Sequence, residues 1–147
     1  MEKERLILRN ISRTDRLFHN YIRSECEKIG INSSFQGIIR ILSRENGLSQ
    51  LELAKRLVLS APTISLTLQK MEYLGYISRR QDTTDARITR VYLTEEGFKM
   101  DDKIKALFRK LEERINLIVS EEEHDVILKI LESINQEIIT LEEEESK

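Results

Sequence analysis

The stretch 49–76, SQLELAKRLVLSAPTISLTLQKMEYLGY, decides the fold of this 147-residue chain, because it holds two short amphipathic helices in immediate succession. Ser49 and Glu52 have the spacing of a capping box, which predicts that the first of these helices begins there. Ser60 is a preferred N-cap residue, and Pro62 is tolerated in the first turn of a helix. A second helix is therefore expected after a turn of only three residues.

A β-hairpin is expected directly after this pair of helices. Residues 76–80 (YISRR) and 89–93 (TRVYL) alternate in the manner of short strands, and the polar, turn-prone segment 81–88 (QDTTDARI) lies between them. Two helices joined by a tight turn and followed by a hairpin predict a winged helix-turn-helix. In such a unit the second helix can enter a major groove of DNA, and the hairpin, or wing, can reach the adjacent minor groove.

Two amphipathic helices are expected before residue 49. The first spans residues 5–29, where apolar residues recur at helical spacing. The second begins near Ser33, because Ser33 and Gln36 match the spacing of a capping box. The Asn46-Gly47 pair is expected to end it.

Two long helices are expected after residue 93. One runs from Thr94 to about Val119, and the other follows Ser120, which forms a further capping box with Glu123. The chain has only 5 Gly and 1 Pro, in agreement with a high helix content. The expected fold class is mainly α with a small β-hairpin (α+β), a winged helix-turn-helix flanked by long helices.

The net charge of −2 hides an uneven distribution of charge. Residues 1–48 carry nine Lys or Arg and six Asp or Glu, and residues 49–93 carry seven and four. Residues 94–147 carry eight and sixteen. A polyanion would be attracted to the first two segments and repelled by the last. Helical surfaces also carry charge for solubility, so charge alone leaves both interpretations open.

Residues 49–97 resemble the winged helix-turn-helix of the MarR (multiple antibiotic resistance) regulators. The flanking helices match that family in number and length, so the resemblance covers nearly all of the chain. It implies one MarR-like domain over 1–147, with a DNA-binding lobe at 33–97 and helical dimerisation regions at 1–30 and 98–145. The matching pieces, in order and spacing, are SQxELA at 49–54, SxPTIS at 60–65, ExxGYI at 72–77, RR at 79–80, DAR at 85–87 and LTxxG at 93–97.

The resemblance implies a homodimeric, sequence-specific transcriptional regulator, usually a repressor. Two recognition helices would bind a pseudo-palindromic operator in double-stranded DNA, one per half-site, and a small anionic or aromatic effector would release the protein. An alternative is a winged-helix protein-interaction module or anti-activator that has lost DNA binding. The net acidic charge and an apolar Leu66 in the recognition helix favour this alternative.

The residues expected to contact DNA lie on the recognition helix and on the wing. Leu66 suggests contacts with thymine methyl groups or recognition of DNA shape rather than bidentate readout of guanine. Arg87 is expected to face the DNA while Asp85 holds the base of the hairpin. The alternative for Arg87 is a surface arginine paired with Asp82 or Asp85. Arg79, Arg80 and Arg90 are expected to be peripheral. The full predicted set of DNA contacts is Ser60, Pro62, Thr63, Leu66, Thr67, Lys70, Thr83, Thr84 and Arg87.

Three aromatic residues, Phe18, Tyr21 and Phe35, lie where the resemblance implies an effector pocket, although each is also a candidate core residue. Cys26 is the single cysteine and lies between Glu25 and Glu27, which would raise the thiol pKa. We therefore expect it to be a packed side chain rather than a redox sensor.

Other chemistry finds no support in the sequence. The two histidines, His19 and His124, have no second imidazole or cysteine partner nearby in the sequence, so no metal site is expected. No phosphate-binding loop, nucleophile elbow or zinc-protease motif is present, so neither an enzyme nor a cofactor is predicted. No signal peptide or membrane-spanning segment is recognisable, which predicts a soluble, cytoplasmic protein without a membrane partner.

Overall fold

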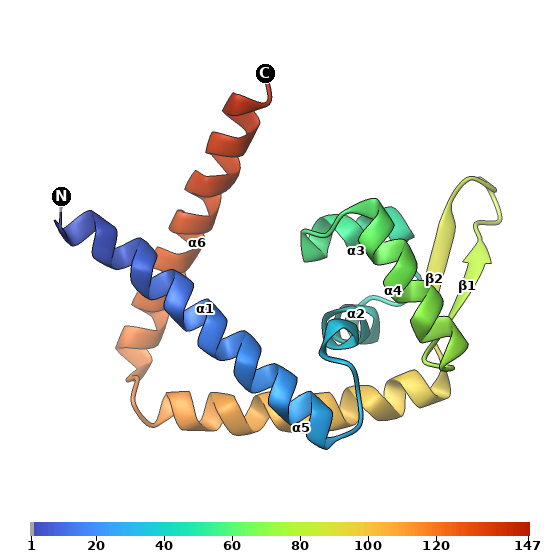
Figure 1. Ribbon diagram of the computed structural model, residues 1–147, viewed down its shortest axis with the longest axis horizontal. Coiled ribbons are helices and arrows are strands. Elements are labelled where there is room, and N and C mark those ends of the chain that lie inside the picture. The colour runs from blue at the N-terminus through green and yellow to red at the C-terminus, as the bar shows by residue number, and fades with distance from the viewer. Residues whose placement is uncertain (1) are drawn as a thin grey trace. The chain divides into compact units, whose positions relative to one another are not determined.

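The computed structural model describes residues 2–147, and it confirms the mainly α fold with a small hairpin (Figure 1). Among these residues no helix is both long and apolar enough to cross a membrane. In chain order the elements are α1 (Glu2–Lys28), α2 (Ser33–Arg44), α3 (Gln50–Leu57), α4 (Ala61–Tyr73), β1 (Ile77–Gln81), β2 (Thr89–Leu93), α5 (Glu95–Asn116) and α6 (Glu121–Glu145).

The chain divides into two compact units, residues 1–107 and 108–147. The first unit has a continuous apolar core to which α1, α2, α3, α4, β2 and the first part of α5 all contribute. Because α2 packs on both α3 and α4, the core holds the helix-turn-helix pair in place. Its fully buried side chains include Cys26, Ile38, Ile39, Leu42, Leu53, Ile64, Leu68, Met71, Val91 and Ile104.

The expected helix starts at Ser49 and Ser120 are confirmed. Each serine hydroxyl accepts a hydrogen bond from the backbone three residues on, and each glutamate there accepts one back from the serine N–H. At Ser60 the hydroxyl accepts from the Thr63 N–H, and Pro62 lies in the first turn of α4, as predicted. These caps satisfy N–H groups that have no partner within the helix.

The predicted capping box at Ser33 and Gln36 is wrong. The N-cap of α2 is Asn32, whose side-chain oxygen accepts hydrogen bonds from the N–H and the hydroxyl of Ser34 at 2.9 and 2.8 Å. Asparagine is as good an N-cap as serine. Asn32 comes before Ser33 in the chain, so it caps the helix, and Ser33 becomes the first helical residue.

Other predicted boundaries differ from the structure by one to three residues, among them the start of the first strand and the end of α5. The first strand starts at 77 rather than 76, because the Tyr76 N–H donates to the Met71 carbonyl (3.0 Å) and closes the end of α4. Helix α5 ends at Asn116 rather than near 119, and the turn that follows is closed by hydrogen bonds from the N–H groups of Ile118 and Val119 to the Ile115 carbonyl.

The wing is an antiparallel hairpin in which Ile77 lies opposite Leu93 and Gln81 lies opposite Thr89. Residues 47–49 run along the other edge of β2. The Gly47 N–H donates to the Val91 carbonyl (3.0 Å), and the Val91 N–H donates to the Leu48 carbonyl (2.9 Å). The segment that leads into α3 is therefore bonded directly to the wing.

Candidate nucleic-acid interface

The turn between α3 and α4 depends on an unusual backbone conformation at Val58. Its φ of 54° lies in the left-handed region, which a β-branched residue rarely adopts. The conformation lets the Leu59 N–H donate to the Ala54 carbonyl at 2.9 Å, which ends α3 and leaves only three residues before α4. This turn fixes the direction in which α4 leaves α3.

Helix α4 presents a largely neutral face to solvent. Pro62, Thr63 and Leu66 are exposed and Thr67 is half-buried. The opposite face, which includes Ile64 and Leu68, is fully buried, as helical periodicity predicts. Lys70, one turn after Leu66, is the first charged residue of α4.

The hydroxyl groups of this face are partly committed to local hydrogen bonds. The Thr67 hydroxyl donates to the Thr63 carbonyl at 2.9 Å. The hydroxyls of Ser60 and Thr63 lie 2.8 Å apart, so one of them donates to the other. Their remaining capacity is mainly that of hydrogen-bond acceptors.

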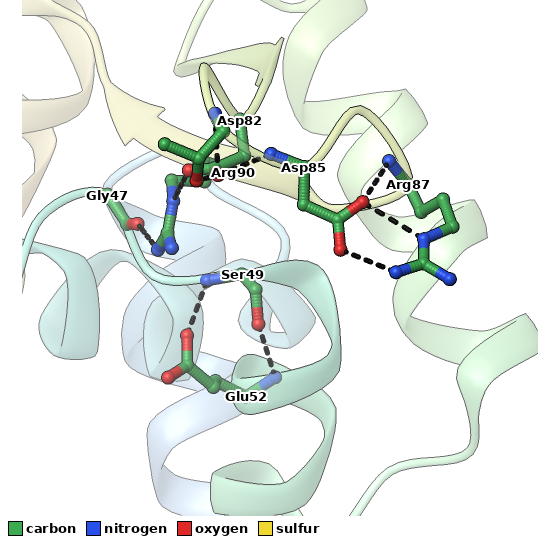
Figure 2. Close-up of polar contacts among 8 residues, drawn as sticks. Gly47, Ser49, Glu52, Asp82, Asp85, Arg87 and Arg90 are labelled. Atoms are coloured by element: carbon green, nitrogen blue, oxygen red, sulfur yellow. Dashed lines mark hydrogen bonds and ion pairs between the residues drawn. The ribbon is translucent and has the colours of Figure 1, made fainter.

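Asp82 organises the tip of the wing (Figure 2). Its Oδ2 accepts hydrogen bonds from the Thr84 N–H (3.2 Å), the Thr84 hydroxyl (2.6 Å) and the Asp85 N–H (3.1 Å). Its Oδ1 accepts from Arg90 Nε at 2.6 Å. The Arg90 guanidinium, followed by the Thr84 hydroxyl, holds the pKa of Asp82 well below its usual range.

Arg90 connects the wing to the helix-turn-helix, a structural role that the sequence analysis did not predict. Besides its contact with Asp82, its guanidinium donates to the Gly47 carbonyl at 3.0 Å, and its side chain is half-buried. Ser49, the N-cap of α3, pairs with Arg90 through an isolated β-bridge. Sequence reasoning missed this contact because Gly47 lies 43 residues before Arg90 and carries no side chain.

Asp85 lies in the turn and holds Arg87, which is the pairing that the alternative interpretation of Arg87 names. The Arg87 guanidinium donates twice to the carboxylate, from Nε to Oδ1 and from a terminal nitrogen to Oδ2, both at 3.0 Å. The side chain of Arg87 nevertheless remains 90% exposed. Asp82, which the sequence analysis did not select, makes most of the hydrogen bonds that shape the tip.

Arg87 lies close to the start of the recognition helix. It lines a hollow of about 370 Å³ together with Ala61 at the start of α4 and Ser49 and Gln50 at the start of α3. The wing tip thus brings a guanidinium next to the N-terminal turns of both helices. Thr83 and Thr84 are exposed on the same loop, with the Thr84 hydroxyl bound to Asp82.

The other two wing arginines have structural contacts. The Arg79 guanidinium and backbone N–H donate to the carboxylate of Glu72 at 2.9–3.3 Å, which joins β1 to the end of α4. The guanidinium of Arg80 lies 4.7 Å from the centre of the Tyr92 ring, within cation–π distance.

A cavity of about 490 Å³ lies between the α1–α2 loop, α2 and the end of α4. Of the three aromatic residues predicted to line an effector pocket, Phe35 lines it, whereas Phe18 and Tyr21 are not among its described lining residues. The ring centres of Phe35 and Tyr76 are 6.2 Å apart on its wall. The lining residues are Gly30, Ile31, Asn32, Phe35, Gln69, Lys70, Tyr73, Leu74 and Tyr76.

Cys26 is fully buried, and burial followed by the charge of Glu25 raises its thiol pKa. The expected direction of the shift is confirmed, with burial as the larger cause. No group of three or more His, Cys, Asp and Glu side chains that could hold a metal ion occurs in the described part of the chain.

The MarR family model matches residues 36–89, from α2 to the start of β2. A MarR transcriptional regulator from Methanosarcina mazei Go1 is 28% identical, with coverage of 93% of this chain and 99% of that one and a TM-score of 0.82. Over residues 36–89, and over most of its length in structure, the chain is similar to MarR regulators. The similar structure is described as a transcriptional regulator, which agrees with the prediction of a regulator rather than an enzyme.

Two further solved structures share the fold of this chain. The Staphylococcus aureus MepR–DNA complex is 24% identical, covering 90% of this chain and 96% of that one, with a TM-score of 0.78. Streptococcus pneumoniae FabT in complex with DNA is 23% identical, covering 92% and 99%, with a TM-score of 0.74.

The hydrogen bonds of Asp82 make a prediction about pH. Because its folded-state pKa is depressed, Asp82 stabilises the fold fully above its unfolded pKa of about 3.9, and this contribution is lost as the pH falls further. Asp82→Asn should therefore be less stable than the wild type at pH 7, and the difference should shrink below about pH 4.

Urea denaturation followed by circular dichroism between pH 7 and pH 3 measures this difference. Asp102→Asn, at an exposed position of α5, is the matched control and should show no such dependence. Equal stability of Asp82→Asn and the wild type at pH 7 would contradict the assignment.

Proposed function

We propose that this chain is a homodimeric transcriptional repressor that binds a pseudo-palindromic operator in DNA and is released by a small-molecule effector. The observation that carries the proposal is the position of Arg87. Its exposed guanidinium shares a hollow with the start of α4, so wing and recognition helix can contact one duplex together.

The local charge supports DNA as the partner. Residues 49–93 carry seven basic and four acidic side chains, and all four arginines of this segment that follow α4 lie in or next to the wing strands. Attraction to phosphates would supply affinity without sequence preference. MepR and FabT, which share this fold, were each solved in complex with DNA.

A second candidate is a protein-interaction module that keeps the winged fold without binding DNA. The 56% exposure of Leu66 on α4 favours it, because exposed apolar side chains also suit protein contacts. The two functions differ in one observable: only the first gives selective binding to a duplex.

The second unit supports the homodimer. Helix α6 has 25 residues and none of them is buried. Ile127, Leu131, Ile138 and Leu141 recur at helical spacing and are 43–49% exposed, as a helix covered by a second copy would be. Two-fold symmetric operators require such a dimer.

The cavity beside α4 supports release by an effector. Its walls carry the rings of Phe35, Tyr73 and Tyr76, and Lys70 supplies a cation at the lining. An aromatic anion would match this combination of apolar walls and one positive charge. Lys70 is also a predicted DNA contact, so an anion that pairs with it would compete with DNA.

Arg87→Ala tests DNA binding. We expect roughly a tenfold or larger loss of affinity for a duplex selected from a random-sequence pool, with unchanged helix content, since the side chain is exposed. Fluorescence anisotropy at one fixed salt concentration measures it. Arg114→Ala, an exposed arginine of α5, is the control. Wild-type affinity of Arg87→Ala would remove the wing from the interface, and failure to select any duplex would favour the protein-interaction module.

Light scattering tests the dimer. The wild type should have twice the 17.3 kDa mass of one chain, and Leu131→Glu should shift it towards the monomer, because a buried, unpaired carboxylate is costly. Gln136→Glu adds the same charge at another exposed position of α6 and should leave the mass unchanged. A wild type that is monomeric at all concentrations would refute the homodimer.

Benzoate, as the simplest aromatic carboxylate, tests the cavity, with benzyl alcohol as the uncharged control. Benzoate should perturb the NMR signals of Phe35 and Tyr76 and weaken binding to the selected duplex, and Lys70→Met should reduce both effects. Perturbations confined to residues outside the cavity would contradict this assignment.

A further inference from the structure

The N-terminal two turns of α4 carry no group that reads guanine by a pair of hydrogen bonds. In the major groove, Arg or Lys is the usual bidentate partner of guanine, and Asp or Glu is the usual acceptor for cytosine. Residues 61–69 contain none of these side chains. In helix-turn-helix proteins the N-terminal residues of the recognition helix are the ones that reach the bases.

Hydrogen-bond donors on this face are also scarce. The Thr67 hydroxyl hydrogen is bound to the Thr63 carbonyl, and the Ser60–Thr63 pair uses one of its two hydroxyl hydrogens internally. Gln69 is exposed, but it lies two turns from the start of α4 and lines the cavity beside Lys70. What the face offers to a base pair is therefore mainly carbon.

These carbon groups form one continuous surface. The Pro62 ring, the methyl groups of Thr63 and Thr67 and the side chain of Leu66 lie at positions i, i+1, i+5 and i+4, on one side of the helix. Leu66 is at the centre and is 56% exposed. The apolar group that B-DNA displays in its major groove is the C5-methyl of thymine.

We propose that α4 recognises its operator by packing this surface, with Leu66 at its centre, against thymine methyl groups. The inference rests on the proposed function and names the sequence class that the recognition helix selects. Contact with a methyl group removes apolar area from water. A G·C pair in the same place offers no methyl group to this surface. The methyl contact therefore favours A·T pairs.

The wing favours the same base composition. A·T tracts have a narrow minor groove with strong negative potential, which attracts an inserted arginine. Arg87 is the exposed guanidinium that lies beside Ala61 at the start of α4. Helix and wing would therefore select A·T pairs in adjacent grooves by independent physical effects.

Replacement of thymine by deoxyuridine tests the proposal, since it removes the methyl group and keeps the base pair. Duplexes are selected with the full-length protein from a random-sequence pool, and the best one is resynthesised with deoxyuridine in the half-sites or, as a control, only in the flanks. We expect the wild type to lose roughly fourfold in affinity for each contacted methyl group and nothing for the flanks.

Leu66→Ala should bind the thymine duplex more weakly and should lose much less affinity when the methyl groups are removed. Ile118→Ala, which truncates another exposed apolar side chain in the turn after α5, should respond to deoxyuridine as the wild type does. Equal wild-type affinity for both duplexes, or selected half-sites with G·C pairs under α4, would overturn methyl recognition while leaving DNA binding intact. Selection of no duplex would overturn the proposed function and this inference together.

Discussion

The winged helix-turn-helix of this protein depends on the contact of Arg90 with Asp82 and with the Gly47 carbonyl. A two-stranded hairpin is only marginally stable by itself. Here the hairpin is bonded along one edge to residues 47–49, and a half-buried guanidinium joins its tip to the segment that leads into α3. The same carboxylate of Asp82 closes the tip by accepting from Thr84 and Asp85. The position of the wing tip is therefore tied to that of the helices.

Because of this contact, α4 and the wing tip hold fixed positions relative to each other. The turn at Val58 sets the direction of α4, and the Asp82–Arg90 contact sets that of the tip, which carries Arg87 beside Ala61. Groups that are already in place lose less conformational entropy when they bind. The charges are also unevenly divided: the wing is rich in arginine, whereas the N-terminal face of α4 is neutral.

Local sequence signals predicted the fold well, because helix caps and hairpin strands are read within a few residues. Ser49 with Glu52, Ser120 with Glu123 and Ser60 all cap the helices they were expected to cap. Errors arose where two signals competed or where contacts are distant. Asn32 precedes Ser33 and is an equally good cap, and apolar spacing continues past the end of α5 through Ile118. The role of Arg90 and the cavity that joins Phe35 to Lys70 depend on packing between distant segments, which one sequence does not reveal.

The most direct test of this account is a double-mutant cycle in DNA affinity between Asp82→Ala and Arg87→Ala. Removal of the negative charge of Asp82 should by itself strengthen binding to DNA. A weaker binding of Asp82→Ala would therefore show that Asp82 acts by positioning the wing tip. We expect Asp82→Ala to weaken binding about tenfold in the wild-type background and less than about twofold in the Arg87→Ala background, because contacting groups are not additive. Unchanged or tighter binding of Asp82→Ala, or losses that simply multiply, would contradict the central role of the fixed wing.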